Sequence, residues 1–436
     1  MDISHTREQV VLRPGRSVRG SVQLPGDKSV SHRYAMLSGI AEGPSRLENY
    51  STGADCASTL ACMRALGVNW EKKGSVIEVE GRGVQLAAPM QPLDCGNSGS
   101  TMRMLSGIVA GQKFSSEMIG DESLSRRPME RVIKPLTLMG AKIESREGKP
   151  PLRISGSPLK AIDYKLPVAS AQVKSCVLFA GLFAEGETRV EEPLRTRDHT
   201  EVAVRAFGGK LERKSLGAGS EVRIRGGQRL RGVETRIPGD LSSAAFFLCA
   251  AALFPDSQLS VPKLLMNPTR ARLLDILMQM GLRISVTELE EINGEMVGSL
   301  QVEGGRLQGT KLSGSDSAAL IDEIPVLAAI APYTEQGIEV RDAKELRVKE
   351  SDRVSAIVTN LRKMGAQVEE REDGMRISGG QQLHGAELDS FGDHRIAMAF
   401  AVAALRAEGD TQIQGAETTS ISYPAFFQTL EAVVER

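Results

Sequence analysis

The stretch Leu24-Pro25-Gly26-Asp27-Lys28-Ser29-Val30-Ser31-His32-Arg33 predicts a tight turn followed by a helix. A proline and a glycine favour the turn, and Asp27 or Ser29 can cap the helix that follows. The first turn of a helix exposes free N–H groups and carries partial positive charge. Because Lys28 and Arg33 add their own charge, the stretch indicates either an anion site or an ordinary capped helix with solvated cations.

The stretch Ile237-Pro238-Gly239-Asp240-Leu241-Ser242-Ser243 repeats this turn in the second half of the chain and leads into an apolar helix over 244–254. The lysine of the first copy is missing here. Two matching turns suggest the points at which the chain passes between two similar halves. We therefore expect one domain over 1–24 and 240–436 and a second over 25–239, with crossings near 24–26 and 238–240.

A helix that ends in a hydrophobic residue and a glycine, followed by a hairpin of alternating strands, recurs five times along the chain. Such a glycine suits the left-handed position just past a helix. A sixth helix, over 425–434, closes the chain without a hairpin. The recurrence predicts an α/β fold of six βαβαββ units, three per domain, with a strand over 10–18 joining the C-terminal units. The glycines are Gly67, Gly140, Gly208, Gly281 and Gly365.

Bulk composition excludes several classes of protein. At 436 residues the chain is expected to form two domains. A net charge of −1 gives no general attraction to nucleic acid or to an anionic membrane. The five cysteines show no C-x-x-C spacing, so we expect buried thiols in a reducing compartment and no metal. Residues 1–14 lack a signal pattern and no apolar run reaches membrane-spanning length, which predicts a cytoplasmic protein.

Four further segments carry polar or cationic residues at predicted turns and helix starts. The Gly/Ser turn over 94–103 is typical of either ligand binding or simple capping. The arginine pair over 126–127 is not favoured at a helix start by the dipole, so either a bound anion or solvation must compensate. Gln172 heads an apolar helix and needs partners for both amide atoms. The loop over 195–200 adds cations, and we expect its His199 to be a structural hydrogen bonder.

Acidic and cationic residues gather in three segments of the C-terminal half. Asp322 and Glu323 precede an apolar helix, where they can cap it or one can act as a general base. In the cluster over 345–353, Lys349 and Arg353 share a face if the segment is helical, and Glu350 can pair with either. Segment 393–395 places a histidine and an arginine at a helix start that we expect Asp393 to cap. Together the patches predict a cleft for small, multiply anionic substrates, without a Walker motif or a metal site.

These motifs resemble the 5-enolpyruvylshikimate-3-phosphate synthase family along nearly the whole chain. The most specific are Arg347-Val348-Lys349-Glu350-Ser351-Asp352-Arg353 and Asp393-His394-Arg395, accompanied by Pro25-Gly26-Asp27-Lys28-Ser29, Gly96-Asn97-Ser98-Gly99 and Arg127-Pro128. The resemblance implies a two-domain inside-out α/β barrel with helix N-termini facing the interdomain cleft. It also implies transfer of the enolpyruvyl group of phosphoenolpyruvate to the 5-hydroxyl of shikimate 3-phosphate, with release of phosphate. No cofactor and no macromolecular partner are implied, and a monomer is the expectation.

The resemblance assigns roles to individual residues. Asp322 would take the hydroxyl proton, Glu350 would protonate the methylene carbon, Lys28 and Lys349 would stabilise the tetrahedral adduct, and His394 is a further catalytic candidate. The residues implied for shikimate 3-phosphate are Lys28, Ser29, Arg33, Ser170, Ala171, Gln172, Arg197, Asp322 and Lys349. The residues implied for phosphoenolpyruvate are Lys28, Asn97, Gly99, Arg127, Gln172, Arg353 and Arg395.

The sequence departs from the family pattern at Ile421, where some members carry a lysine shortly before the aromatic-Pro pair, which puts one phosphoenolpyruvate contact in doubt. Gly99 with Ser100 resembles the arrangement that leaves room for the inhibitor glyphosate. One alternative is UDP-N-acetylglucosamine enolpyruvyl transferase, but its expected reactive cysteine is absent from 120–127. A non-catalytic phosphate-ligand binding protein is the other, and it would not need Asp322 and Glu350.

Overall fold

The computed structural model describes residues 8–436, so residues 1–7 of the expected first domain lie outside the described part. The chain divides into two compact units. Unit 1 contains the described residues up to Pro25, then Pro238–Glu290 and Met296–Arg436; unit 2 contains Gly26–Ile237 and Glu291–Glu295. The first two divisions fall at the paired Pro-Gly turns. The short segment Glu291–Glu295 also belongs to unit 2, although the chain on both sides of it belongs to unit 1. No sequence pattern predicted this further crossing.

Unit 2 contains three four-stranded sheets of one design. In each, two parallel strands are followed across the sheet by the two strands of an antiparallel hairpin. The sheets, in spatial order, are β14 (Glu234–Arg236), β3 (Glu42–Glu48), β5 (Val76–Arg82) and β4 (Asn69–Lys73); β6 (Leu93–Asp94), β7 (Ser115–Ile119), β9 (Lys149–Ser155) and β8 (Lys142–Arg146); and β10 (Asp163–Lys165), β11 (Glu187–Glu192), β13 (Gly219–Arg225) and β12 (Leu211–Leu216).

Unit 1 also contains three sheets, two of them completed by distant parts of the chain. They are β16 (Arg283–Ile292), β17 (Glu295–Glu303), β15 (Gln258–Leu265), β2 (Ser17–Ser21) and β24 (Val434–Glu435); β18 (Thr310–Leu312), β19 (Ile338–Val340), β21 (Gly374–Ile377) and β20 (Val368–Arg371); and β1 (Gln9–Leu12), β23 (Thr411–Gln414) and β22 (Glu387–Asp389). The prediction of six repeated units is confirmed by these six small sheets, three in each unit.

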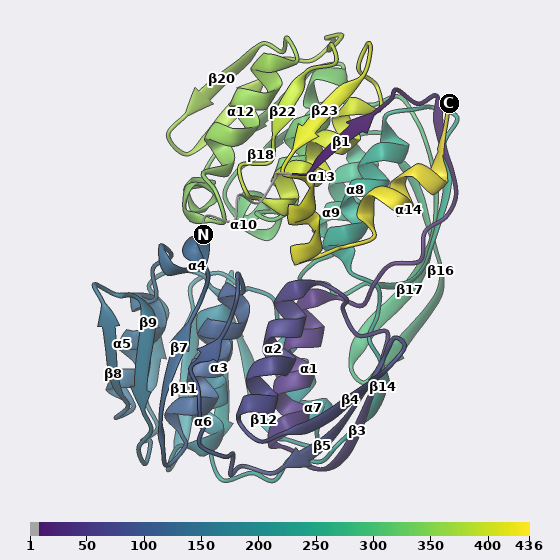
Figure 1. Ribbon diagram of the computed structural model, residues 1–436. Helices are drawn as coiled ribbons and strands as arrows, with labels where there is room; N and C mark the ends of the chain where they lie inside the picture. The colour runs from purple at the N-terminus through teal and green to yellow at the C-terminus, as the bar shows by residue number, and fades with distance from the viewer. Residues whose placement is uncertain (1–7) are drawn as a thin grey trace. The chain divides into compact units, whose positions relative to one another are not determined.

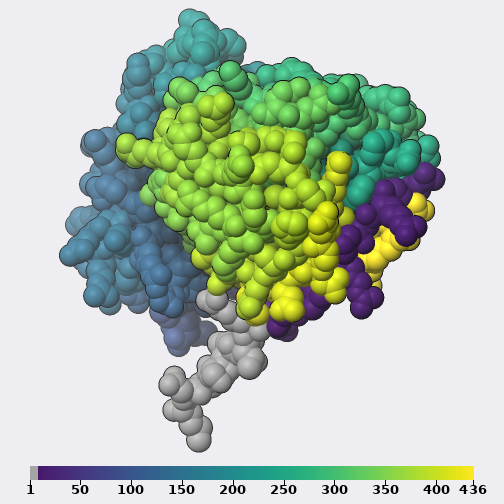
Figure 2. All heavy atoms as spheres, turned by 90° about the horizontal axis from the view of Figure 1, so that it is seen from above, coloured from purple at the N-terminus to yellow at the C-terminus, as the bar shows by residue number. Residues whose placement is uncertain are grey.

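The expected single strand over 10–18 is wrong. Pro14 and Gly15 interrupt it, and the chain forms β1 and β2 in two different sheets. β1 pairs antiparallel with β23, where it takes the place of the hairpin that the last repeat lacks. β2 lies parallel to β15 and antiparallel to β24. Figure 1 shows purple β1 beside yellow β23, and Figure 2 shows the purple and yellow ends of the chain meeting on one surface.

Each repeat contributes one deeply buried helix and one amphipathic helix. Every residue of α8 is buried, as expected for a helix that is apolar on all sides. In unit 2, α3 and α6 approach so closely that a Cβ on Gly107 would lie 2.1 Å from the Cys176 carbonyl oxygen, so only glycine fits there. The buried helices are α1 (Lys28–Ile40), α3 (Gly99–Ala110), α6 (Ala171–Phe183), α8 (Leu241–Ala252), α11 (Ile324–Ile330) and α13 (His394–Ala404).

The amphipathic helices end as their sequences predict. All five glycines named above have positive φ, between 80° and 104°, as a left-handed helix end requires. Each of the five is followed by a strand of the predicted hairpin, and the last helix is followed by β24. The amphipathic helices are α2 (Ala54–Ala65), α5 (Glu130–Leu138), α7 (His199–Ala206), α9 (Arg272–Gln279), α12 (Arg353–Lys363) and α14 (Phe426–Val433). The short elements are α4 (Glu122–Ser125), α10 (Ser315–Ala319), η1 (Ala331–Tyr333), η2 (Lys344–Val348) and η3 (Ala416–Ile421).

Candidate functional site

The acidic and cationic segments of the C-terminal half converge on one cluster in unit 1. Asp322 comes from the turn before α11, Glu350 and Arg353 from the approach to α12, and Asp393 and Arg395 from the start of α13. Since the three segments are separated in sequence, the packing of α11, α12 and α13 against one another is what assembles the cluster. The result is a group of carboxylates and cations in direct contact.

Arg353 lies at the centre of this cluster, and its side chain is only 1% exposed. Its Nε donates to Asp393 Oδ2 at 2.8 Å, its Nη2 to Glu350 Oε2 at 2.6 Å, and its Nη1 to Asp322 Oδ1 at 3.4 Å. Burial, the largest single influence, acts to lower the pKa of Arg353, but the surrounding carboxylates outweigh it and raise that pKa above its ordinary value. The guanidinium therefore stays charged and holds both candidate catalytic carboxylates.

The Asp322 carboxylate faces three cations. Besides Arg353, Lys349 Nζ lies 3.6 Å from Oδ1, and Arg395 Nη2 lies 3.9 Å from Oδ2. Arg395 also holds the backbone at this point, because its Nη1 donates to the Asp322 carbonyl oxygen at 2.6 Å. His394, the other candidate from this segment, is buried as the first residue of α13.

The structure decides two points that the sequence left open in these segments. Lys349 and Arg353 do not share a helical face, because Lys349 has extended backbone after η2 and α12 begins only at Arg353. Asp352 caps that helix by accepting from Ser355 N at 3.1 Å, so the preceding residues lie outside it. The acidic pair before α11 does not cap that helix either, since its N-cap residue Glu323 makes no side-chain capping bond. The prediction that Asp393 caps α13 is confirmed by its bond to Arg395 N.

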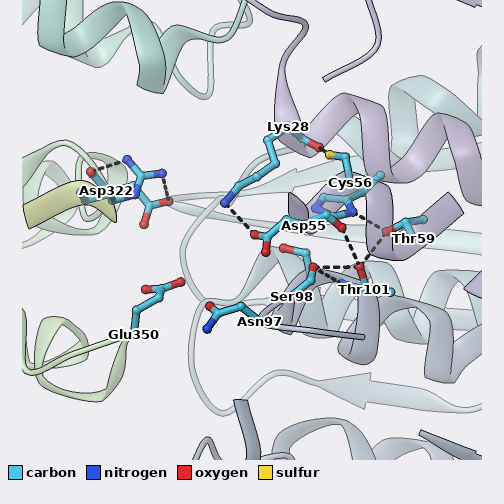
Figure 3. Close-up of polar contacts among 12 residues, drawn as sticks. Lys28, Asp55, Cys56, Thr59, Asn97, Ser98, Thr101, Asp322 and Glu350 are labelled. Carbon is cyan, nitrogen blue, oxygen red and sulfur yellow. Dashed lines mark hydrogen bonds and ion pairs between the residues drawn. The ribbon is translucent and has the colours of Figure 1, made fainter. Parts of the chain in front are cut away.

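In unit 2, Lys28 begins α1 and extends toward the first turn of α2. Asp27 caps α1 through Val30 N, and Lys28 Nζ lies 3.0 Å from Asp55 Oδ2 (Figure 3). One turn further along, His32 Nδ1 and Thr59 Oγ1 are 2.7 Å apart in the interior. Burial, assisted by the charges of Lys28 and Arg33, holds the pKa of His32 well below 6.5. The cationic side chain beside α2 is therefore Lys28, with a neutral imidazole behind it.

The Gly/Ser turn before α3 is joined to the loop that carries Arg127. Arg127 Nη2 donates to Asn97 Oδ1 at 2.7 Å and to Ser123 Oγ at 3.0 Å. A Cβ on Gly99 would lie 3.5 Å from Arg127 Nη1 and 3.1 Å from Arg103 Nη1. Two guanidinium groups thus border the space that the glycine leaves at the start of α3, which is an arrangement suited to an anion.

Gln172 has partners for both amide atoms, as its position at the head of an apolar helix predicted. Arg103 Nη1 donates to its Oε1 at 2.8 Å, and its Nε2 donates to Ser100 Oγ at 2.9 Å. Ser170 caps α6 through Val173 N, which leaves Ala171 as the first residue of the helix. The starts of α3 and α6 are therefore linked through side chains.

Arg33 is placed differently from the other candidates because it lies inside α1 and is buried. Its Nε donates to Thr200 Oγ1 at 2.7 Å, its Nη1 to the Ser29 carbonyl oxygen at 2.8 Å, and its Nη2 to Ser175 Oγ at 2.8 Å. Burial lowers the pKa of Arg33 to about 10, with the charge of Arg197 contributing in the same direction. Arg197 itself is half-buried in the loop before α7. His199 proves to be the structural hydrogen bonder expected, 2.7 Å from Glu295 Oε1.

The arginine pair at 126–127 does not lie at a helix start. Arg126 is the C-terminal cap of α4, where a cation is favoured, and it pairs with Glu122. α5 begins three residues after Arg127, at Glu130. The dipole argument for a bound anion at this pair is therefore wrong, and the anion-binding potential of Arg127 rests on its neighbours Asn97 and Gly99.

The family model for EPSP synthase (3-phosphoshikimate 1-carboxyvinyltransferase) matches residues 12–430. The chain belongs to the EPSP synthase family. A protein from Koribacter versatilis named 3-phosphoshikimate 1-carboxyvinyltransferase is 58% identical over 430 residues, covering 98% of this chain and 100% of that protein. A protein of the same name from Solibacter usitatus is 55% identical, covering 97% and 99% of the two chains.

The fold agrees with that of solved members of the EPSP synthase family. The structure of EPSP synthase from Acinetobacter baumannii matches with a TM-score of 0.86 and 41% identity, covering 98% of each chain. These likenesses favour the EPSP synthase family over UDP-N-acetylglucosamine enolpyruvyl transferase.

No helix within residues 8–436 is both long and apolar enough to cross a membrane.

Two residues that contact the candidate site of this EPSP synthase family member were not singled out from sequence. Arg103 holds Gln172 and also donates to the Pro128 carbonyl oxygen at 3.4 Å, and Asp55 pairs with Lys28. Arg103 could have been found from sequence, because a charged residue one turn into an otherwise apolar helix is unusual. No sequence signal pointed to Asp55, because an acidic residue in the first turn of a helix is common for reasons of helix stability alone. Ile421, the departure from the family pattern, is the last residue of η3.

Proposed function

We propose that this chain transfers the enolpyruvyl group of phosphoenolpyruvate to the 5-hydroxyl of shikimate 3-phosphate by addition and elimination, releasing phosphate. The reaction lies in the shikimate pathway to chorismate and the aromatic amino acids. Family membership supports the overall reaction. The observation that best supports the chemistry is the pair of carboxylates, Asp322 and Glu350, held on one buried guanidinium and bordered by further cations.

Asp322 is the proposed general base. Its side chain is 17% exposed, and its Oδ1 lies 3.6 Å from Lys349 Nζ and 3.4 Å from Arg353 Nη1. A carboxylate that solvent can reach in this way is suited to take the proton of the 5-hydroxyl. As the hydroxyl oxygen bonds to C2 of phosphoenolpyruvate, Glu350 gives a proton to the methylene carbon, which becomes a methyl group. In the elimination, the Glu350 carboxylate takes a proton back from that methyl group while the C2–O bond to phosphate breaks. The departing phosphate takes up the proton that Asp322 holds, so both carboxyl groups return to their starting states.

Lys28 and Lys349 are the proposed stabilisers of the tetrahedral adduct. Negative charge moves toward the phosphate as it leaves, and a fixed ammonium in a dry site stabilises that charge most effectively. The salt bridge to Asp55 limits the positions that Lys28 Nζ can take. His394 is retained as a further candidate for proton transfer.

Phosphoenolpyruvate needs partners for one carboxylate and one phosphate, and forked guanidinium groups suit both. We assign these contacts to Lys28, Asn97, Gly99, Arg127, Gln172, Arg353 and Arg395. The space beside Gly99 is bordered by Arg127, which supports a phosphate there. For Arg353, Nη1 makes the longest of the contacts described above, so it is the donor that we assign to the substrate.

Shikimate 3-phosphate is assigned to Lys28, Ser29, Arg33, Ser170, Ala171, Gln172, Arg197, Asp322 and Lys349. The first residue of α6, Ala171, offers a backbone N–H at the positive end of a helix. Arg33 is engaged by three protein groups, so any contact it makes uses its other N–H bonds. We further propose that the protein acts as a cytoplasmic monomer without a cofactor; its five cysteines are buried free thiols, which suits a reducing compartment.

The decisive experiment is phosphate release from purified protein with both substrates present, and with each omitted in turn. Release that requires both substrates supports the proposal, and release without shikimate 3-phosphate contradicts it. Asp322→Ala then tests the assigned base: binding of shikimate 3-phosphate should persist while turnover is lost. Asp256→Ala, an exposed residue of the same unit, is the matched control. Undiminished turnover in Asp322→Ala would end the assignment of the base.

A further inference from the structure

Asp322 and Glu323 are neighbours in sequence, but their carboxylates lie in different surroundings. Asp322 faces Lys349, Arg353 and Arg395, as described above. The Glu323 carboxylate is directed into the interior of unit 1, where the residue is only 4% exposed. There its Oε1 accepts a hydrogen bond from Ser242 Oγ. The acidic pair thus divides into one carboxylate at the candidate site and one in the core.

The hydroxyl of Ser242 has a second partner, Arg270. Ser242 lies in the first turn of α8, and its Oγ accepts from Arg270 Nη2 at 2.6 Å. The backbone N–H of Ser242 donates to Asp240 Oδ1 at 2.7 Å, and the same Arg270 nitrogen lies 3.9 Å from that Asp240 oxygen. All four side chains are buried. A chain of polar contacts, which we call the Arg270–Ser242–Glu323 chain, therefore joins the turn before α9, the start of α8 and the start of α11.

We propose that Glu323 is a positioning residue, and that the Arg270–Ser242–Glu323 chain fixes the backbone that carries Asp322. This inference rests on the proposed role of Asp322 as general base. The N-cap residue of α11 is Glu323 itself, and its side chain makes no capping bond to that helix but is held by this contact to α8 instead. On the other side of the same peptide, Arg395 Nη1 binds the Asp322 carbonyl oxygen. The Asp322–Glu323 dipeptide is thus held from both ends.

A purely stabilising purpose is a poor explanation for these buried charges. Taking an arginine and a glutamate out of water costs several kcal/mol each, and well-packed apolar residues often do as well or better. What a buried polar chain can supply is one defined geometry, since each donor must meet its acceptor. A general base needs a fixed position, because its oxygen must lie within hydrogen-bond reach of the proton it takes.

The test begins with Ser242→Ala, which removes one oxygen atom from the middle of the chain. We expect kcat for phosphate release to fall by about 10- to 100-fold, the range for small misplacement of a reacting group, while KM for both substrates changes little. Ser243→Ala is the matched control: Ser243 is the next residue of α8, is equally buried, and is not part of the chain. Its kcat should equal that of the unaltered protein.

Two replacements of Glu323 separate geometry from charge. Glu323→Gln keeps an acceptor for Ser242 and should retain most of the activity, whereas Glu323→Met removes the acceptor and should lose as much kcat as Ser242→Ala. Urea unfolding of each variant reports whether it folds. Should Glu323→Met fail to fold, Ser242→Ala still decides the question, because it leaves the rest of the core intact.

A double-mutant cycle with Asp322→Asn distinguishes positioning from general support of the fold. If Ser242 acts through Asp322, adding Ser242→Ala to Asp322→Asn should change the residual single-turnover rate by no more than about twofold. The same loss in both backgrounds would overturn the inference, as would an unaltered kcat in Ser242→Ala alone. Full activity of Asp322→Asn would instead contradict the proposed base, so the two failures are distinguishable.

Discussion

Arg353 and Asp393 form an ion pair in the interior of unit 1, with Nε 2.8 Å from Oδ2 and side chains that are 1% and 0% exposed. Removing the Asp393 charge takes away one of the three carboxylates around this buried guanidinium, while Glu350 and Asp322 remain. Loss of one charged hydrogen-bond partner in the interior costs about 1–3 kcal/mol. Asp393→Asn should therefore lower the free energy of unfolding by that amount, measured by urea denaturation. Asp410→Asn, an exposed position, should leave it unchanged. An equal stability of the two variants would contradict the importance of the pair.

Lys28 offers a test of the cationic residues that we assign to the substrates in unit 2. Replacing Lys28 by Met keeps an unbranched apolar side chain of nearly the same length but removes the ammonium proposed to stabilise the adduct. A single fixed donor of this kind contributes about 10²- to 10³-fold in kcat. We expect a loss of that size with a folded protein, measured by phosphate release and urea unfolding. Lys72→Met, exposed on β4, is the control; an active Lys28→Met would exclude the assigned role.

The lowered pKa of the buried His32 predicts how the stability of the protein depends on pH. The folded protein holds the pKa of this imidazole well below 6.5, chiefly by burial, whereas the unfolded chain has an ordinary histidine. As the pH falls below about 6.5, the unfolded chain takes up a proton that the folded protein does not, so stability falls by up to about 1.4 kcal/mol per pH unit from this group.

His32→Asn should remove that contribution, although the variant will differ in stability at neutral pH through its altered contact with Thr59. The quantity to compare is the slope of unfolding free energy against pH, from urea titrations between pH 7 and the onset of acid unfolding. The unaltered protein should show the steeper slope. Parallel curves would mean that His32 is not a source of the acid sensitivity.

Gly208 is a position at which the free-energy cost of a left-handed backbone conformation can be measured without a steric clash. Its φ is 80°, and a Cβ added there would meet no atom within 4 Å. Gly208→Ala should therefore lower the free energy of unfolding by about 1–2 kcal/mol through backbone conformation alone. Gly208→Asn should cost less, because asparagine adopts this conformation more readily. Urea unfolding checks both, and an Asn variant weaker than the Ala variant would contradict the explanation.

Much of the fold followed from local patterns. The glycine ends of five helices and the hairpins after them could be predicted because each depends on a few consecutive residues. The single strand expected over 10–18 was wrong because alternation alone could not show that Pro14-Gly15 redirects the chain between two sheets. Local spacing left open whether Lys349 and Arg353 share a helical face, and the cap at Asp352 decides that they do not, because the helix begins only at Arg353.

The candidate site was predictable in its residues but not in its contacts. The resemblance named Asp322, Glu350 and Arg353, yet it did not indicate that one guanidinium holds both carboxylates. The role of Arg103 could not be predicted from sequence, because it depends on a contact with Gln172, which lies in another helix. Such pairings follow from how closely α3 and α6 pack, and that packing depends on residues such as Gly107, which lies one helical turn after Arg103 and against the backbone of α6.

The sequence by itself determined the repeats, the helix ends and the family, because those depend on residue types at short, regular spacings. Only the tertiary structure decided which of two adjacent acids, Asp322 or Glu323, meets the cations and which is buried against Ser242. Neighbouring residues at a helix start point in different directions, and the groups they meet come from helices far away along the chain. No local pattern contains that information, because it is set by how the buried helices pack.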